Sequence, residues 1–296
     1  VVALIAAFAG LIFLHQPGEV HIASRFDAQR PVGADAGAQQ VHVFPSTDEF
    51  GVAAGGDGAA RLLQLLAFTA MEEPASFTAH NLRREKAKVA FLLDYNSRWA
   101  TRALPQGRTY LASQIALDWY STVARLGVDV DIIGQHSDLE GYQLVLAPDL
   151  VIPDQAFVQK LAASGAKVLF GPRSGSKTED MHIPEGLPTG PLASLIDVSV
   201  ARVESLPEFH GESVLYGNET YPAGVWRETV RTSETVLATF EGDYRNGAPA
   251  LVGNDKARYM ATGARGELLD KVIGDALGWA SVEALADLGD LRITRR

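Results

Sequence analysis

Adjacent carboxylates are the first residues in this chain whose chemistry could support catalysis. They form the pairs Asp48–Glu49 and Glu72–Glu73. Retaining hydrolysis of a glycosidic bond uses two carboxyl groups about 5 Å apart, one as nucleophile and one as acid. Neighbouring residues point in different directions on a helix or a strand, so neither pair converges on one bond. We interpret both pairs as solvated acidic turns.

The segment GPRSG contains a serine that could act as a nucleophile. A nucleophile elbow has glycine two residues before and two residues after its serine. Around Ser174 these positions hold Pro172 and Ser176. Asp180 and His182 would complete a triad, but the triad needs the strained turn that the glycines allow. The segment therefore does not predict a serine hydrolase.

Charged and aromatic residues follow two apolar runs that are typical of buried strands. Asp94, Arg98 and Trp99 come after the first run, and Arg173 and Ser174 come after the second. Parallel strands deliver such residues to the carboxyl edge of a sheet, where open α/β sheets bind ligands. We interpret all five as binding or subunit-contact residues. For Trp99 three roles stay open: a sugar site, a contact with a neighbouring subunit, and core packing.

Metal, thiol and phosphate chemistry find little support in the sequence. The chain has no cysteine, and its seven histidines include no i, i+4 helical pair of the kind that zinc hydrolases use. The glycine-rich stretch 51–58 lacks the Gly-Lys-Ser/Thr ending of a phosphate loop. We therefore expect no metal and no cofactor.

Composition and charge narrow the possible partners. Apolar residues make up 47% of the 296 residues and charged residues 21%, which is ordinary for a globular protein. A formal net charge of −10 argues against nucleic acid, because phosphate binding relies on clustered Lys and Arg. The apolar start, residues 1–14, is shorter than the about twenty residues of a membrane span. We expect no nucleic-acid or membrane partner, and a cytoplasmic location.

From residue 88 onward, strand and helix patterns alternate along the chain. The periodicity predicts strands over 88–93, 128–133, 143–147 and 167–170, and helices over 61–71, 109–126 and 154–163. Gly127 and Gly165 are suitable helix ends. Strands and helices that alternate at these lengths imply right-handed crossovers and a doubly wound parallel sheet. The sequence therefore predicts an α/β fold.

Past residue 190 the pattern is less regular. Further strands are expected over 198–204, 235–240, 248–252 and 258–261. A helix over 267–278 is expected to pack back on the same sheet.

The order of these segments resembles the trimerisation region of family 42 glycoside hydrolases, which are β-galactosidases. The stretch Val89–Trp99 is similar to the first strand of that region, and LGVDVD at 126–131 is similar to the second. LEGYQLVLAP at 139–148 and GPRSG at 171–175 continue the match, and 248–262 is similar to a late hairpin. The resemblance implies a flavodoxin-like (class I glutamine amidotransferase-like) sheet. It also implies a homotrimer that acts on a β-galactoside or oligosaccharide.

Upstream, FLHQPGEV at 13–20 resembles the end of the family's catalytic barrel, where a nucleophile Glu stands two residues before Gln-Pro-Gly. Leu14 occupies that position here, and a leucine cannot attack an anomeric carbon. The Glu and His that the family places after a later loop correspond to Ala53 and Gly56. Glu19 and Glu49 are the only nearby carboxylates that could act as catalytic residues.

The resemblance divides the chain into a partial (β/α) barrel end at 1–86, a trimerisation-like domain at 87–289 and the start of a β domain at 290–296. It implies β-galactosidase-type hydrolysis in which this chain supplies mainly the trimerisation domain and lacks the full carboxylate pair. Since Val1 is not a methionine, we interpret the chain as a fragment. Two alternatives stay open: a non-catalytic homologue that binds sugar or only oligomerises, and an unrelated hydrolase on a similar sheet.

Overall fold

The computed structural model describes residues 12–16, 19–22, 86–108, 110–207, 212–224, 226–242 and 246–284. For the first two ranges only the backbone is described. The chain divides into two units, residues 1–83 and 84–296. The predicted helix 61–71, the candidate Glu49 and the proposed β-domain start at 290–296 lie outside the described residues.

The described strands of the first unit form an antiparallel hairpin. Strand β1 spans Ile12–Gln16 and strand β2 spans Glu19–Ile22. Leu14 pairs with Val20 and Gln16 pairs with Glu19, and the register shifts between these two pairs. Leu14 and the candidate Glu19 therefore both lie in the hairpin.

The second unit is built on a mixed sheet of nine strands. Its strands are β3 (Val89–Leu92), β4 (Val130–Ile133), β5 (Leu144–Ala147), β6 (Lys167–Phe170), β8 (Ser213–Tyr216), β9 (Glu219–Pro222), β11 (Thr235–Glu241), β12 (Pro249–Gly253) and β13 (Ala257–Met260). They lie in the order β4-β3-β5-β6-β13-β12-β11-β8-β9. The five strands from β4 to β13 are parallel, and the remaining pairings are antiparallel.

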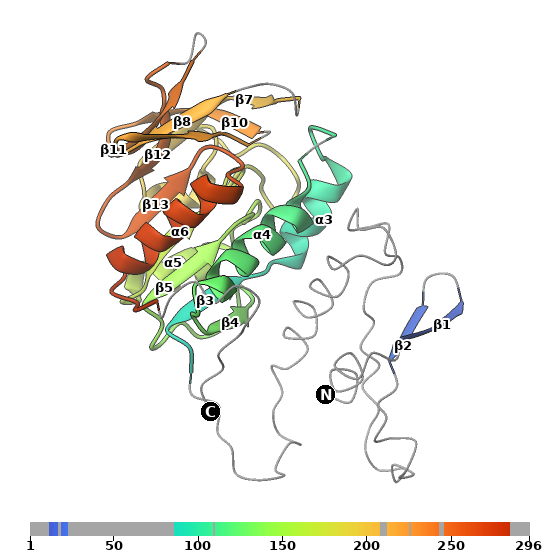
Figure 1. The fold of residues 1–296 in the computed structure, drawn as a ribbon. Coiled ribbons are helices and arrows are strands. Elements are labelled where there is room, and N and C mark those ends of the chain that lie inside the picture. Colours follow the sequence, from blue (N-terminus) through green and yellow to red (C-terminus); the bar gives the residue numbers. More distant parts are fainter. Residues whose placement is uncertain are drawn as a thin grey trace. The chain divides into compact units, whose positions relative to one another are not determined.

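Helices cover the parallel strands. They are α3 (Tyr95–Ala103), α4 (Ala112–Arg125), α5 (Gln155–Ala163), the 3-10 helix η3 (Gly190–Ser194) and α6 (Gly266–Trp279). Helices α4 and α6 pack against each other and run side by side over the sheet (Figure 1). No helix within the described ranges has the length and apolarity needed to cross a membrane.

Alternating side chains of β3 fill two separate cores, as the pleat of a strand requires. Phe91 meets Tyr120 of α4 edge to face, with ring centroids 5.9 Å apart. Ala90 and Leu92 belong to the cluster that also contains Phe157 of α5 and Leu192 of η3. The parallel strands are therefore buried on both faces, as expected for a sheet whose crossover helices cover it.

Two further strands form a ribbon beside this sheet. Strand β7 (Val198–Ser205) pairs antiparallel with β10 (Trp226–Thr232). Val200 and Val230 of the ribbon share a core cluster with Val252 of β12. In Figure 1 the ribbon lies next to β8 and β12. The ribbon thus packs on the antiparallel half of the sheet, which helix α6 also contacts at β8 and β9.

The structure refines the predicted α/β fold. The parallel strands and the helices α4, α5 and α6 occur where the periodicity placed them. The sheet is mixed rather than wholly parallel, because β8, β9, β11 and β12 extend it with antiparallel pairs. The predicted strand 198–204 exists as β7, but it belongs to the ribbon. Helix α3 and strands β8, β9 and β10 were not predicted.

Candidate functional site

Asp94, Arg98 and Trp99 lie on or beside α3, which starts directly after β3. The Asp94 carboxylate caps this helix, since the Ser97 backbone N–H donates to Asp94 Oδ2 at 2.7 Å. Trp99 points outward with 57% of its surface exposed, so core packing is wrong as its role within the described residues. The ring centroids of Tyr95 and Trp99 are 6.5 Å apart.

Arg173 is buried at the end of β6, with only 2% of its surface exposed. Its backbone has φ 65°, in the left-handed region that residues other than glycine rarely adopt. The guanidinium donates to the carbonyl oxygens of Leu104 at 2.9 Å and Pro105 at 3.2 Å. It also lies 5.0 Å from the ring centroid of Tyr110 and 5.4 Å from that of Trp226. Arg173 therefore fastens the end of α3 and the ribbon to the parallel strands.

Glu228 of β10 is the carboxylate at the centre of this joint. Its Oε1 accepts from the Arg173 backbone N–H at 2.8 Å and from Trp226 Nε1 at 3.0 Å, and its Oε2 accepts from Tyr259 Oη at 2.6 Å. Burial raises the pKa of Glu228, while the hydrogen bonds from Tyr259 and Trp226 and the charge of Arg173 oppose that shift. Both carboxylate oxygens are occupied, so Glu228 connects strands β10 and β13 with the loop after β6 instead of facing a substrate.

Ser174 is fully buried, and its hydroxyl donates to the Gly171 carbonyl at 2.8 Å. His182 is exposed, and its backbone N–H donates to Thr178 Oγ1 at 3.1 Å. A serine that bonds its own loop has no activating base, so these contacts give no support to a Ser174 triad.

Asp149 was missed by the sequence reasoning, although it follows β5 as Asp94 follows β3. It is 2% exposed, and burial raises its pKa to about 6, with Arg98 lowering the pKa and Asp94 raising it. Asp149 Oδ2, Arg98 Nε and Arg98 Nη2 are buried and have no hydrogen-bond partner among the described residues. Arg173 Nε is a buried atom of the same kind, so incomplete polar atoms at this edge are not confined to the group beside α3.

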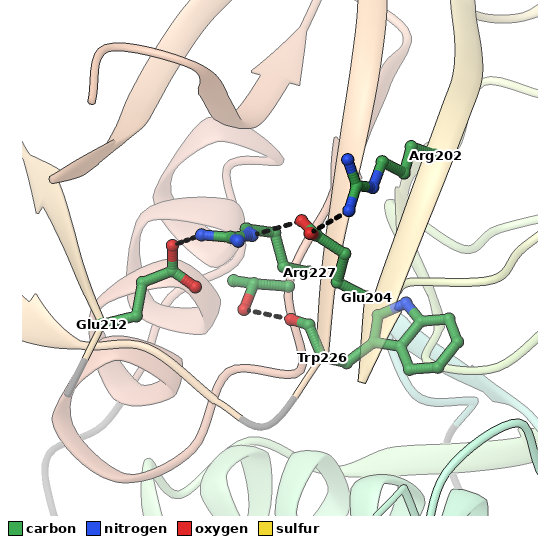
Figure 2. Close-up of polar contacts among 6 residues, drawn as sticks. Arg202, Glu204, Glu212, Trp226 and Arg227 are labelled. Atoms are coloured by element: carbon green, nitrogen blue, oxygen red, sulfur yellow. Dashed lines mark hydrogen bonds and ion pairs between the residues drawn. The ribbon is translucent and has the colours of Figure 1, made fainter. Parts of the chain in front are cut away.

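A second ionic cluster stabilises the ribbon. Arg227 is buried between Glu204, whose Oε2 accepts from Arg227 Nε at 2.9 Å, and Glu212, whose Oε1 accepts from Arg227 Nη1 (Figure 2). Arg202 reaches Glu204 from the outside at 3.0 Å. Thr262 donates its hydroxyl to the Trp226 carbonyl at 2.8 Å. These contacts fix the strand that carries Glu228.

An open groove of about 690 Å³ lies at the opposite, amino edge of the parallel strands. Residues 138–143, which lead into β5, form one wall, and Lys160, residues 163–165, Lys167 and Ala280 form the rest. None of the residues predicted as binding sites lines this groove. In the described part of the chain no three His, Cys, Asp or Glu side chains are placed to hold a metal ion.

Comparison with known proteins identifies the family to which the second unit is similar. A family model described as "Beta-galactosidase trimerisation domain" matches residues 87–283. The chain belongs to this family. The resemblance drawn from the sequence motifs is thereby confirmed.

The relatives of this trimerisation-domain chain are larger proteins. A β-galactosidase of Thermus thermophilus is 35% identical over 211 residues, which cover 71% of this chain and 32% of that protein. The solved β-galactosidase of Marinomonas ef1 is 28% identical, with a TM-score of 0.65, over 76% of this chain and 33% of that one. The solved β-galactosidase of Halorubrum lacusprofundi is 27% identical, with a TM-score of 0.65, over 77% of this chain and 34% of that one. The chain thus spans about a third of the length of these relatives.

Proposed function

We propose that this chain acts as the assembly part of a β-galactosidase, forming a homotrimer of an enzyme that hydrolyses terminal β-galactosides. The family match over residues 87–283 is the observation that carries the proposal. Relatives named β-galactosidases, about three times as long as the aligned region, support it. In this proposal residues 1–86 are the end of a barrel, 87–289 the trimerisation domain and 290–296 the start of a β domain. The same proposal places the enzyme in the cytoplasm.

The proposed trimerisation domain has a flavodoxin-like parallel half. Numbered along the chain, the parallel strands β3, β4, β5, β6 and β13 lie in the spatial order 2-1-3-4-5. Flavodoxin-like folds have this order. The class I glutamine amidotransferase-like description rests on the same strand order. The antiparallel extension from β12 to β9 is then an addition to that fold.

The chemistry of the described carboxylates supports a role in assembly rather than in bond cleavage. Retaining hydrolysis requires one carboxylate that is free to attack and a second that donates a proton. Glu228 has both oxygens occupied by other side chains and backbone. Asp94 is committed to capping α3. We therefore assign Arg173 and Ser174 to internal joints, and Asp94, Arg98 and Trp99 to the neighbourhood of a subunit contact.

The test is the solution mass of the purified chain together with its activity. Analytical ultracentrifugation should give three times the 31.7 kDa of one chain. A chromogenic β-galactoside should not be hydrolysed above the rate of a heat-denatured control, because the carboxylate pair is incomplete. A monomer at all concentrations would refute the assembly role, and turnover would refute the missing pair.

A sugar-binding homologue is the second candidate, supported by the exposed aromatic pair of Tyr95 and Trp99. Aromatic faces of this kind offer apolar area to a ligand. Titration with galactose and lactose, followed by tryptophan fluorescence, distinguishes this candidate. Of the four tryptophans, Trp119 and Trp226 are buried and Trp279 is half-buried beneath Lys167 and Arg258, so loss of a saturable change in Trp99→Phe is what assigns the change to Trp99.

A further inference from the structure

The outer face of α3 carries side chains of the types that dominate protein interfaces. Tyr95, Trp99 and Arg102 follow one another at i, i+4 and i+7, so they form one stripe along the helix. Tyr95 is 39% exposed, Trp99 is 57% exposed, and Arg102 is exposed as well. Tryptophan, tyrosine and arginine are the residues most enriched at interface hot spots. We call this stripe the α3 face; α3 is seen at the edge of the domain in Figure 1.

A loop of opposite character flanks the same helix. Residues 179–187, here called the acidic loop, expose Ile183 (64%) and Leu187 (43%). Three exposed acidic residues are interleaved with them: Glu179, Asp180 and Glu185. Met181 of this loop packs against a small cluster that contains Ala100 from the buried side of α3 together with Val151 and Ile152. The α3 face and the acidic loop are therefore neighbours on one molecule.

Three-fold symmetry explains why two different surfaces are needed. A trimer with three-fold symmetry is closed by heterologous contacts, in which one patch of each subunit meets a different patch of the next. The α3 face is aromatic and basic, while the acidic loop is aliphatic and acidic. Complementary charge fixes the register of such contacts and disfavours wrong pairings.

We propose that the α3 face of one copy of this chain docks against the acidic loop of the next copy, and that three such contacts close the ring. This inference rests on the proposed assembly function and names the surface that performs it. Trp99 is the apolar anchor against Ile183 and Leu187, and Arg102 faces the acidic residues, with Glu185 between the two exposed aliphatic side chains.

Removal of the anchor is the first test, on the full 296-residue chain. Trp99→Ser should weaken trimer formation by about tenfold or more, since a central tryptophan is a typical hot spot. Val236→Ser removes a 43% exposed apolar side chain on β11 and serves as the matched control. The control should sediment like the wild type. Far-ultraviolet circular dichroism and thermal unfolding of each variant check that the domain is folded.

A charge exchange is the second test, because it needs no loss of apolar surface. Arg102→Glu alone and Glu185→Arg alone should each weaken association, since each places like charges together. The double variant Arg102→Glu/Glu185→Arg should restore it. Recovery in the double variant identifies a contact between copies, which a purely structural role of either residue would not produce.

The outcomes separate this inference from the proposed function. A monomeric wild type overturns both. A trimeric wild type whose Trp99→Ser and single charge variants remain trimeric overturns the docking surface and leaves the assembly function standing. Loss of trimer in the single variants without recovery in the double overturns the pairing with the acidic loop. A galactose-dependent change at Trp99 in a trimer that the variants leave intact overturns the docking surface in favour of a sugar site.

Discussion

The two edges of the parallel strands differ in what their polar groups do. At the carboxyl edge, Arg173, Glu228 and Tyr259 are buried and bond to one another and to nearby backbone. At the amino edge, Lys160 and Lys167 border an open groove and donate to backbone carbonyls of His136 and Trp279. The amino edge thus has an open groove bordered by two lysines, whereas Arg173, Glu228 and Tyr259 at the carboxyl edge are committed to internal hydrogen bonds.

This difference shows that reactive residue types at a strand end do not by themselves identify a binding site. Hydrogen bonds in a region that excludes water are stronger than exposed ones, and a buried polar group left unpaired costs more. A buried network is therefore suited to holding helix, ribbon and sheet in one arrangement. An exposed hydrogen bond such as that of Lys160 at the amino edge contributes little to holding these elements together. Four substitutions test how large the difference is.

The largest effect is expected at Glu228. Glu228→Ala removes the acceptor for Tyr259, Trp226 and the Arg173 backbone, and leaves these donors buried. We expect a loss of about 3–5 kcal/mol in the free energy of unfolding, the range for breaking one partner out of a buried charged network. Urea denaturation measures this. Glu228→Gln, which keeps an acceptor oxygen and the shape, should lose less, and equal losses for both would contradict the hydrogen-bonding argument.

Substitution of Asp149 should change how the free energy of unfolding depends on pH. Burial raises its pKa to about 6 from an ordinary value of 3.8, so the folded protein holds this proton more tightly than the unfolded one. Its contribution to stability is full below about pH 4, declines between pH 4 and pH 6, and stays reduced above, by about 3 kcal/mol in total. Asp149→Asn should flatten this part of the stability profile. The free energy of unfolding of both proteins is measured at pH 4 and pH 7. If the variant shows the same difference between the two pH values as the wild type, a group other than Asp149 causes that difference.

Gly175 tests the loop that carries Arg173. Gly175 has φ 71°, and a Cβ there would lie 2.0 Å from the Thr189 carbonyl oxygen. Gly175→Ala should therefore destabilise the domain by about 2–3 kcal/mol, through backbone strain and a clash. Gly186→Ala is the control, because Gly186 also has positive φ but no atom within 4 Å of the added Cβ. The melting temperature of the control should fall less. Equal falls in melting temperature for the two variants would show that the clash with Thr189 does not destabilise the domain.

The parallel strands could be predicted from sequence because their signal is local. Each is an apolar run that ends in charged residues, and the helices between them carry a 3.6-residue period. Helix α3 was missed because its mean pattern is polar and its two large rings, Tyr95 and Trp99, face outward. Strand β9 was missed because its side chains are mostly exposed, and β8 was missed because only Val214 among its four residues is buried.

The candidate residues were predicted in part. The strand-end rule pointed to Arg173, but its partner Glu228 is distant in the sequence, and its surroundings WRETV carry no motif. Such a long-range contact depends on the pairing of the ribbon with the sheet. Asp149 could have been found, since it follows β5 by the same rule that selected Asp94. The groove at the amino edge had no sequence signal, because its walls come from separate loops.

The smallest effect is expected at the amino-edge groove. Lys160 is exposed, and its ammonium donates only to the His136 carbonyl, at 3.1 Å, among the bonds described. Water replaces such a bond at little cost, so Lys160→Ala should change the free energy of unfolding by less than about 0.5 kcal/mol. The same urea denaturation used for Glu228 measures it. A loss as large as that at Glu228 would mean that the groove is also a joint, and the contrast between the two edges would no longer hold. A small change means that the bond from Lys160 is not needed for the stability of the domain.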